Sequence, residues 1–142
     1  DYGRARAVLK YAVMITTLYG IIVALIVEFC APTLLGLFTK DTTVILLGVQ
    51  YISSYIIDTI FAGIHFSFSG YFAADGKSYI GFIHNIISIS LVRVPGSYIA
   101  SIMYPHNLFP MGLAAPLGSV LSVIICLIAY CILKKKDELS VL

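Results

Sequence analysis

The chain consists of four long apolar stretches separated by short polar joints. The stretches cover residues 11–27, 42–74, 78–104 and 108–133. Each can cross a hydrocarbon core of about 30 Å as a helix that rises about 1.5 Å per residue. None alternates apolar and polar residues over about ten positions, as a membrane strand would. The pattern predicts an all-α bundle of four transmembrane helices at about residues 7–37, 42–73, 78–104 and 108–134.

The helical period also gives the last three stretches two different sides. The polar stripe of the second stretch consists of Tyr51, Ser54, Tyr55, Asp58, Ala62, His65 and Ser69. The opposite stripe, expected to face lipid, consists of Ile45, Val49, Ile52, Ile56 and Ile60. In the third stretch, Ser78, Gly81, Asn85, Ser88 and Gly96 share one side. In the fourth, a stripe suited to close helix contact consists of Gly112, Ala115, Pro116, Ser119 and Cys126.

The composition supports a membrane protein. Hydrophobic residues make up 60% of the 142 residues, charged residues make up 11%, and the mean hydropathy is +0.99. The surface of a soluble domain of this size would need far more charge. We therefore expect the whole chain, 1–142, to belong to a polytopic bundle in the lipid bilayer.

The basic residues outside the apolar stretches predict the orientation of the bundle. One side holds the N-terminal tail, the loop at Lys77 and the C-terminal tail, with Arg4, Arg6, Lys10, Lys134, Lys135 and Lys136; the other holds Lys40. Positive residues favour the cytoplasmic side. We expect both termini to be cytoplasmic, in the inner or plasma membrane. Anionic headgroups account for the basic residues, so no nucleic-acid partner is needed.

Asp58 is the one formally charged residue in the second stretch, at its centre. A carboxylate at the middle of a bilayer costs about 3 kcal/mol on insertion scales, so it should face protein or water. A low dielectric favours its neutral form, which suits proton uptake or cation binding. We expect Asp58 to couple proton or cation movement. The other interpretation is that a protonated Asp58 only hydrogen-bonds to a neighbouring helix.

The other polar-side residues are candidates for a proton path or a cavity lining. This set consists of His65, Ser54, Tyr51, Tyr55 and Asn85. Histidine can carry protons near neutral pH, and tyrosine rings can bind a lipophilic cation. Packing is the simpler explanation for aromatic residues and for a lone histidine.

Arg93 and Pro95 interrupt the third stretch. Pro95 has no N–H, so the carbonyl of Leu91 loses its partner and a kink is expected. The Arg93 guanidinium could satisfy the freed carbonyls or pair with an acid on another helix. We expect a structural or hinge role for Arg93 and Pro95.

No spacing typical of an enzyme or a metal site is present. Cys30, Cys126 and Cys131 form no CxxC motif, and His84 and His106 are far from His65 in sequence. Nucleophile elbows and phosphate loops are also missing. The sequence therefore predicts neither catalysis nor a metal, and no cofactor beyond Na⁺ or H⁺ as a coupling ion.

Several motifs in order resemble the C-terminal part of multidrug and toxic compound extrusion (MATE) transporters: LLGLFTKD, GYFAADGK, VRVP and APLGS. The resemblance covers nearly the whole chain. It implies helices nine to twelve of a twelve-helix antiporter, with eight N-terminal helices as partners. Such antiporters export small amphiphilic or cationic compounds in exchange for Na⁺ or H⁺. Some members have a coupling acid in the tenth helix, where Asp58 is similar in type and face.

Two alternatives to this exporter remain at the level of sequence. A lipid-linked oligosaccharide flippase of the same superfamily would need a cationic cavity for its diphosphate, and Arg93 is the basic residue deep in these helices. A small four-helix membrane subunit would have no transport activity alone.

Overall fold

The computed structural model describes the backbone of residues 2–139 and, within it, the side chains of residues 3–136. This part of the chain contains helices and turns and no strand, which confirms the all-α prediction. The elements are α1 (Tyr2–Gly36), α2 (Thr42–Tyr55), α3 (Asp58–Ala74), α4 (Ser78–Ser88), the π-helical turn η1 (Ile89–Arg93), α5 (Val94–Met103), α6 (Phe109–Gly112) and α7 (Ala114–Leu139).

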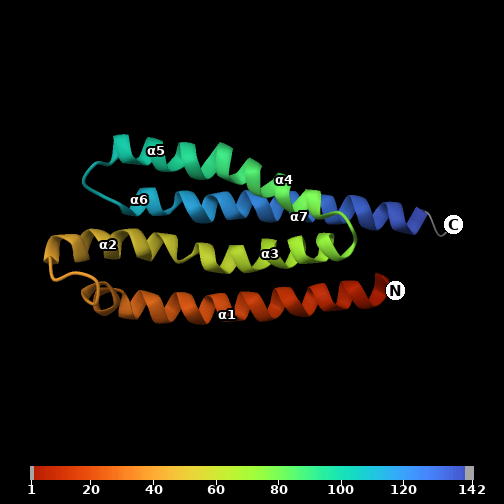
Figure 1. Ribbon diagram of the computed structural model, residues 1–142, viewed down its shortest axis with the longest axis horizontal. Helices are drawn as coiled ribbons and strands as arrows, with labels where there is room; N and C mark the ends of the chain where they lie inside the picture. The colour runs from red at the N-terminus through yellow and green to blue at the C-terminus, as the bar shows by residue number, and fades with distance from the viewer. Residues whose placement is uncertain (1, 140–142) are drawn as a thin grey trace.

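The helices form an elongated bundle of antiparallel neighbours (Figure 1). The α1 helix lies along α2 and α3, and α7 lies along α3 and α4. Three apolar helices could each span a membrane, at Gly3–Gly36, Ser78–Met103 and Phe109–Lys136, and the bent pair of α2 and α3 could form a fourth span. Both ends of the described chain lie at one end of the bundle, beside the α3–α4 connection (Figure 1).

The second span is broken, which corrects the prediction of one continuous helix over residues 42–73. The α2 helix ends at Tyr55, α3 begins at Asp58, and the two are bent by 41°. Neither proline nor glycine occurs near the break, although these residues are the usual causes of kinks. Ile56 and Ile57 lie between the helices, and the break places Asp58 in the first turn of α3.

Two local hydrogen bonds lie at the break. The Ser54 hydroxyl donates to the Tyr51 carbonyl at 3.0 Å, a back-bond that tends to bend helices. At the junction the Thr59 N–H donates to the Ile56 carbonyl at 3.1 Å, a bond of the tighter i→i−3 type. The backbone therefore changes direction while the N–H groups of Ile56, Thr59 and Ile60 keep carbonyl partners.

The third span contains a π-helical turn directly before Pro95. The Val94 N–H donates to the Ile89 carbonyl, five residues back, where an α-helix would use the residue four back. The irregularity expected near Pro95 therefore takes the form of one widened turn, and Arg93 is its last residue.

Close contact between α1 and α3 depends on small residues. A Cβ on the buried Gly20 would lie 3.0 Å from Ile60 Cα and 3.1 Å from the Thr59 carbonyl oxygen. A Cβ on Gly63 similarly lies 3.0 Å from Thr16 Cβ. Ile60 belongs to the stripe expected to face lipid, and that expectation is wrong at this residue, because α1 covers it. Interfaces of this kind are typical of membrane helices.

This packing predicts that Gly20→Ala separates α1 from α3. Its new methyl group would press on backbone atoms, which cannot move aside as a side chain can, and overpacking costs about 1–3 kcal/mol. We expect a lower thermal midpoint for the purified protein in detergent. Gly70→Ala is the matched control, since a Cβ there meets nothing within 4 Å. Equal midpoints for the two variants would contradict the close contact.

Candidate functional site

An ion pair joins the second and third spans inside the bundle. Arg93 Nη2 donates to Asp58 Oδ1 at 3.2 Å and to Oδ2 at 3.3 Å. Asp58 is only 7% exposed, so its carboxylate faces the interior. Of the two interactions considered for the guanidinium, the structure shows the pairing with an acid on another helix. Both charges sit at backbone irregularities, Asp58 at the α2–α3 break and Arg93 at the end of η1.

Ser119 of α7 extends this pair to a third span. The same Arg93 Nη2 donates to Ser119 Oγ at 2.6 Å, and Ser119 Oγ lies 3.4 Å from His65 Nε2. Ser119 and His65 are both buried. Because the hydroxyl oxygen accepts from Arg93, its proton is available to Nε2 of a neutral His65. Arg93 and His65 therefore share one hydroxyl group, and the proton position on His65 affects both.

His65 also meets His84 of α4. The two ring centroids are 5.4 Å apart and the rings are nearly perpendicular, at 71°. His84 Nε2 lies 2.8 Å from Ser69 Oγ, whose hydroxyl donates to the His65 carbonyl at 3.0 Å. An oxygen that has used its proton in this way can accept from Nε2–H of His84. Side-chain hydrogen bonds thus run from Asp58 through Arg93 and Ser119 to His65, and His84 joins them through its ring contact with His65 and through Ser69, which bonds to the His65 backbone carbonyl.

Small and hydroxyl residues hold α4 and η1 against α7 around this network. Ser88 Oγ donates to the Gly118 carbonyl at 2.6 Å, and Ser122 Oγ donates to the His84 carbonyl at 3.4 Å. A Cβ on Gly118 would lie 2.6 Å from Arg93 Cγ. The absence of a side chain at Gly118 therefore gives the arginine its path across α7 to Asp58.

The remaining predicted residues lie outside this network. Tyr51 and Tyr55 stack on each other along α2, with centroids 5.4 Å apart, and Tyr55 is exposed. Ser54 is buried, but its hydroxyl bonds to its own helix. Asn85 is half-buried on α4. Of the five cavity candidates, His65 alone takes part in the hydrogen bonds that reach Asp58.

Sequence reasoning missed His84 and the polar role of Ser119. The two histidines are 19 positions apart on different helices, so sequence spacing did not connect them. Ser119 was assigned to a stripe of small residues for packing. A usable signal was the i, i+4 spacing of His84 and Ser88, which puts two polar groups on one side of α4.

Metal binding has no support among the residues that the structure describes. They contain no group of three or more His, Cys, Asp or Glu side chains placed to hold an ion. Cys30 and Cys131 are exposed and Cys126 is buried, and all three are free thiols. The interior network consists of one ion pair and the hydrogen bonds around it.

Long apolar spans around an ion pair are typical of a polytopic membrane protein, in which a charge must be kept away from lipid. A family model, MatE, matches residues 1–99, from α1 into α5. The chain belongs to the MatE family, and this membership identifies it as a multi-pass membrane protein of the MATE transporter superfamily. No curated protein and no solved structure matches the chain.

The ion pair predicts strong energetic coupling between Asp58 and Arg93. Removal of one partner leaves an uncompensated interior charge, which typically costs about 3–5 kcal/mol. We expect Arg93→Met to lower the thermal midpoint in detergent more than the double variant Asp58→Asn/Arg93→Met does.

The half-buried loop pair of Asp75 and Lys77 provides the control cycle, because a pair at the edge of the bundle that is partly open to solvent should contribute less, about 1 kcal/mol for pairs at the surface. Additive effects of the two interior substitutions would show that the charges do not depend on each other.

Proposed function

We propose that the chain forms part of an antiporter that exports small amphiphilic or cationic compounds in exchange for Na⁺ or H⁺. The ion pair of Asp58 and Arg93 is its coupling element. The observation that carries this proposal is that a buried Asp58 pairs with a half-buried Arg93 from another span, each at a backbone irregularity. Irregular backbone at membrane depth is typical of transporter ion sites.

Coupling follows from competition for one carboxylate. Arg93 Nη2 lies within hydrogen-bonding distance of both oxygens of Asp58, so an arriving Na⁺ ion must displace the guanidinium from at least one oxygen. A proton instead removes the negative charge that holds the guanidinium. Either ion weakens the link between α3 and η1, while the bond from Arg93 to Ser119 can remain.

The two irregular turns are places where loss of this link can change the backbone. The bent junction of α2 and α3 precedes Asp58, and the widened turn of η1 ends at Arg93. Hinges and π turns can absorb large dihedral changes. Loaded and unloaded Asp58 would therefore favour two different packings, which open the substrate cavity to opposite sides of the membrane.

His65 and His84 provide a path for protons to the same site. A proton on Nε2 of His65 would turn the Ser119 oxygen from donor to acceptor in that contact, so that both of its lone pairs would be occupied, one by His65 and one by Arg93. Protonation of His65 would also place a second positive charge near the guanidinium. Proton arrival at His65 and release of Arg93 from Ser119 are therefore linked by one hydroxyl group.

We assign the four spans to helices nine to twelve of a twelve-helix transporter, with eight further helices as partners and both termini in the cytoplasm. The motif resemblance and the common location of both chain ends in Figure 1 support this assignment. The flippase has less support, because Asp58 already offsets the charge that Arg93 would offer a diphosphate. A separate four-helix subunit has less support than part of a transporter, given the family match.

The transport assay for this proposal uses Asp58→Asn in the intact transporter, expressed in cells that lack their own drug pumps. The amide keeps the shape of the side chain but cannot gain or lose a charge. We expect gradient-driven efflux to fall by about tenfold or more, which corresponds to a loss of about 1.4 kcal/mol or more. Asp75→Asn in the α3–α4 loop is the matched control and should keep full activity. Unchanged efflux with an unchanged pH dependence in Asp58→Asn would exclude the coupling role.

Competition between Arg93 and the cation makes a separate prediction for Arg93→Gln. Without the guanidinium, Asp58 is free to bind the coupling ion, so half-saturation should require about tenfold less Na⁺ or H⁺, equivalent to about 1.4 kcal/mol. Substrate efflux should nevertheless fall, because ion release no longer has a competitor. Direct cation-binding measurements on the purified transporter check this outcome, and weaker or equal affinity in Arg93→Gln would show that the two cations do not compete.

A further inference from the structure

The outer end of the bundle contains the α1–α2 and α5–α6 connections, and two spans are interrupted before they reach it (Figure 1). The second span breaks at Ile56 and Ile57, and the fourth breaks at Leu113, between α6 and α7. Pro116 has no N–H to donate to the Gly112 carbonyl, which weakens the helix at Leu113. Each break leaves a short helix, α2 or α6, on its outer side.

The α2 helix holds α6 at both of its ends. At the start of α6, the Leu108 N–H donates to Gln50 Oε1 at 3.2 Å. At its end, a Cβ on Gly112 would collide with Ser54 Oγ and would lie 2.6 Å from the Tyr51 carbonyl oxygen. Gln50 and Ser54 are one turn apart on α2, and the four residues of α6 also form about one turn. The two helices therefore pack as a matched pair.

The contact between Gly112 and Ser54 brings the two breaks side by side. Gly112 directly precedes Leu113, and Ser54 lies two positions before Ile56. Asp58, the proposed coupling residue, follows the same break and begins α3. Hinges are typically a few residues at the ends of elements, where changes in dihedral angle are absorbed. Two such points in contact allow α2 and α6 to turn together.

The α2 helix contacts α1 through a side chain that can rearrange. A Cβ on Gly48 of α2 would lie 2.8 Å from Leu35 Cδ1, and its next two neighbours also belong to the Leu35 side chain. In contrast, a Cβ on Gly20 of α1 would meet backbone atoms of Ile60 in α3. A leucine can adopt another rotamer, whereas packed backbone atoms cannot move aside. The α1–α2 contact therefore tolerates movement better than the α1–α3 contact does.

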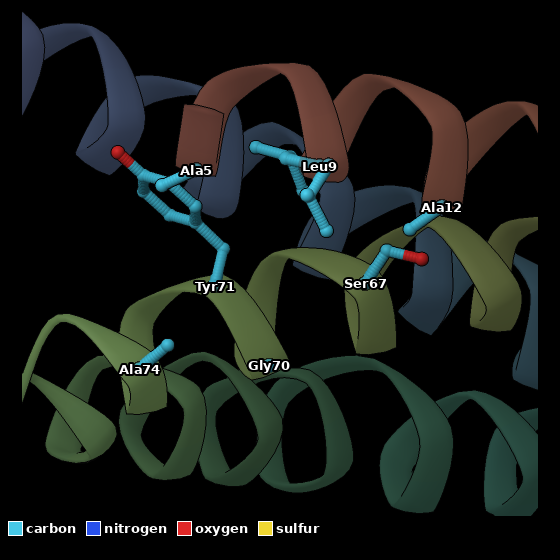
Figure 2. Close-up of a pocket in the computed structure, with 8 residues that line it drawn as sticks. Ala5, Leu9, Ala12, Ser67, Gly70, Tyr71 and Ala74 are labelled. Atoms are coloured by element: carbon cyan, nitrogen blue, oxygen red, sulfur yellow. The ribbon is translucent and has the colours of Figure 1, made fainter. Parts of the chain in front are cut away.

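The buried apolar core lies towards the opposite end, which contains the α3–α4 connection. In the described part of the chain, the core cluster consists of Leu9, Phe68, Phe72 and Cys126. Figure 2 shows Leu9 of α1 and Tyr71 of α3 extending into an apolar pocket between these helices. Buried residues near the outer end are small, such as Ala31 and Ser54. Packing attraction between membrane helices depends on such contacts, so the larger side chains hold α1, α3 and α7 together at the α3–α4 end.

We propose that α2 and α6 form an outer gate, one unit that turns about residues 56–57 and Leu113 to open or close the substrate path at the outer end. This inference rests on the proposed antiport function, because it assigns the moving part of that cycle. Asp58 directly follows the α2–α3 break, so a change of its charge and partners changes the angle at the hinge. Gln50 is the positioning residue that keeps α6 with α2.

The test measures distances between spin labels in the intact transporter by double electron–electron resonance in nanodiscs. One label replaces the exposed Phe66 of α3, and the second replaces Leu46 of α2, Phe109 of α6 or Phe29 of α1, all of them exposed. The background carries Cys30→Ala and Cys131→Ala, because these thiols are exposed. Distances are compared at about pH 5 and about pH 8, with and without tetraphenylphosphonium as the amphiphilic cation.

We expect the Leu46→Cys/Phe66→Cys and Phe109→Cys/Phe66→Cys distances to change together, with one pH midpoint. The Phe29→Cys/Phe66→Cys distance is the matched reference and should stay constant, because α1 and α3 are in backbone contact. Outer distances that stay fixed in every condition would overturn the gate. Different pH midpoints for α2 and α6 would also overturn it, because the two helices would then not be one unit.

Substitutions of Gln50 test its positioning role. Gln50→Leu removes the acceptor for the Leu108 N–H, so the α6 distance should no longer follow the α2 distance and efflux should fall severalfold. Gln50→Glu keeps an acceptor oxygen and should restore the common midpoint. A common midpoint in Gln50→Leu would exclude this role for Gln50.

The gate and the coupling role of Asp58 have separate readouts. In Asp58→Asn, the pH response of both outer distances should disappear. Outer distances that still change together with tetraphenylphosphonium in this variant would support the gate even if efflux showed that Asp58 has no coupling role. Loss of efflux in Asp58→Asn, together with fixed outer distances in the wild type, would instead support the coupling role and overturn the gate.

Discussion

The cost of a bare charge in an apolar interior is the constraint on which this structure depends. Asp58 and Arg93 lie 35 positions apart on different spans, yet Arg93 Nη2 reaches both carboxylate oxygens. Either charge alone would be expensive in an apolar interior, whereas in the pair each charge has the other as its partner. The position of α3 relative to η1 follows from this requirement, and Ser119 ties α7 to the same point.

The break between α2 and α3 and the π-helical turn η1 are both next to this ion pair. If the helix ran regularly through residues 55–58, Asp58 would lie within it and not in the first turn of α3. If η1 were an α-helical turn, Arg93 would have a different position on its helix. Each irregularity keeps most of its backbone groups paired, through an i→i−3 bond at Thr59 and an i→i−5 bond at Val94. The two backbone distortions therefore lie at the two residues of the ion pair, Asp58 and Arg93. Distortions of this kind are common at functional sites.

Much of the architecture could be predicted from the sequence, because membrane helices follow from long apolar stretches alone. Asp58 and Arg93 were evident for the same reason, as charges in an apolar context. The break at Ile56 was not, because no proline or glycine signals it, and the serine back-bond beside it is of a kind that also occurs at Ser67 and Ser69 within the continuous α3. Lipid and a neighbouring helix are equally apolar, so hydrophobic patterning could not show that α1 covers Ile60.

The histidines show a second limit of sequence reasoning. Periodicity places residues on one face of one helix, but the meeting of His65 and His84 depends on how α3 and α4 pack together. The hydroxyl groups of Ser69 and Ser119 complete the network from two helices. Serine is common in membrane helices as a small packing residue, so its role as a polar link becomes visible only once the neighbouring helices are in place.

The two sides of α3 are held by different kinds of interaction, and this difference bears on how the bundle could move. Towards α1, Gly20 and Gly63 allow close backbone contact, which depends on shape and is insensitive to charge. Towards η1 and α7, the contacts at Asp58 and His65 are directional and depend on where protons and ions reside. A change of charge at Asp58 therefore acts on the second side and leaves the first intact. In the proposed mechanism, α1 and α3 should move together as one unit against η1 and α7, because the ion pair that a coupling ion would displace lies at the latter interface.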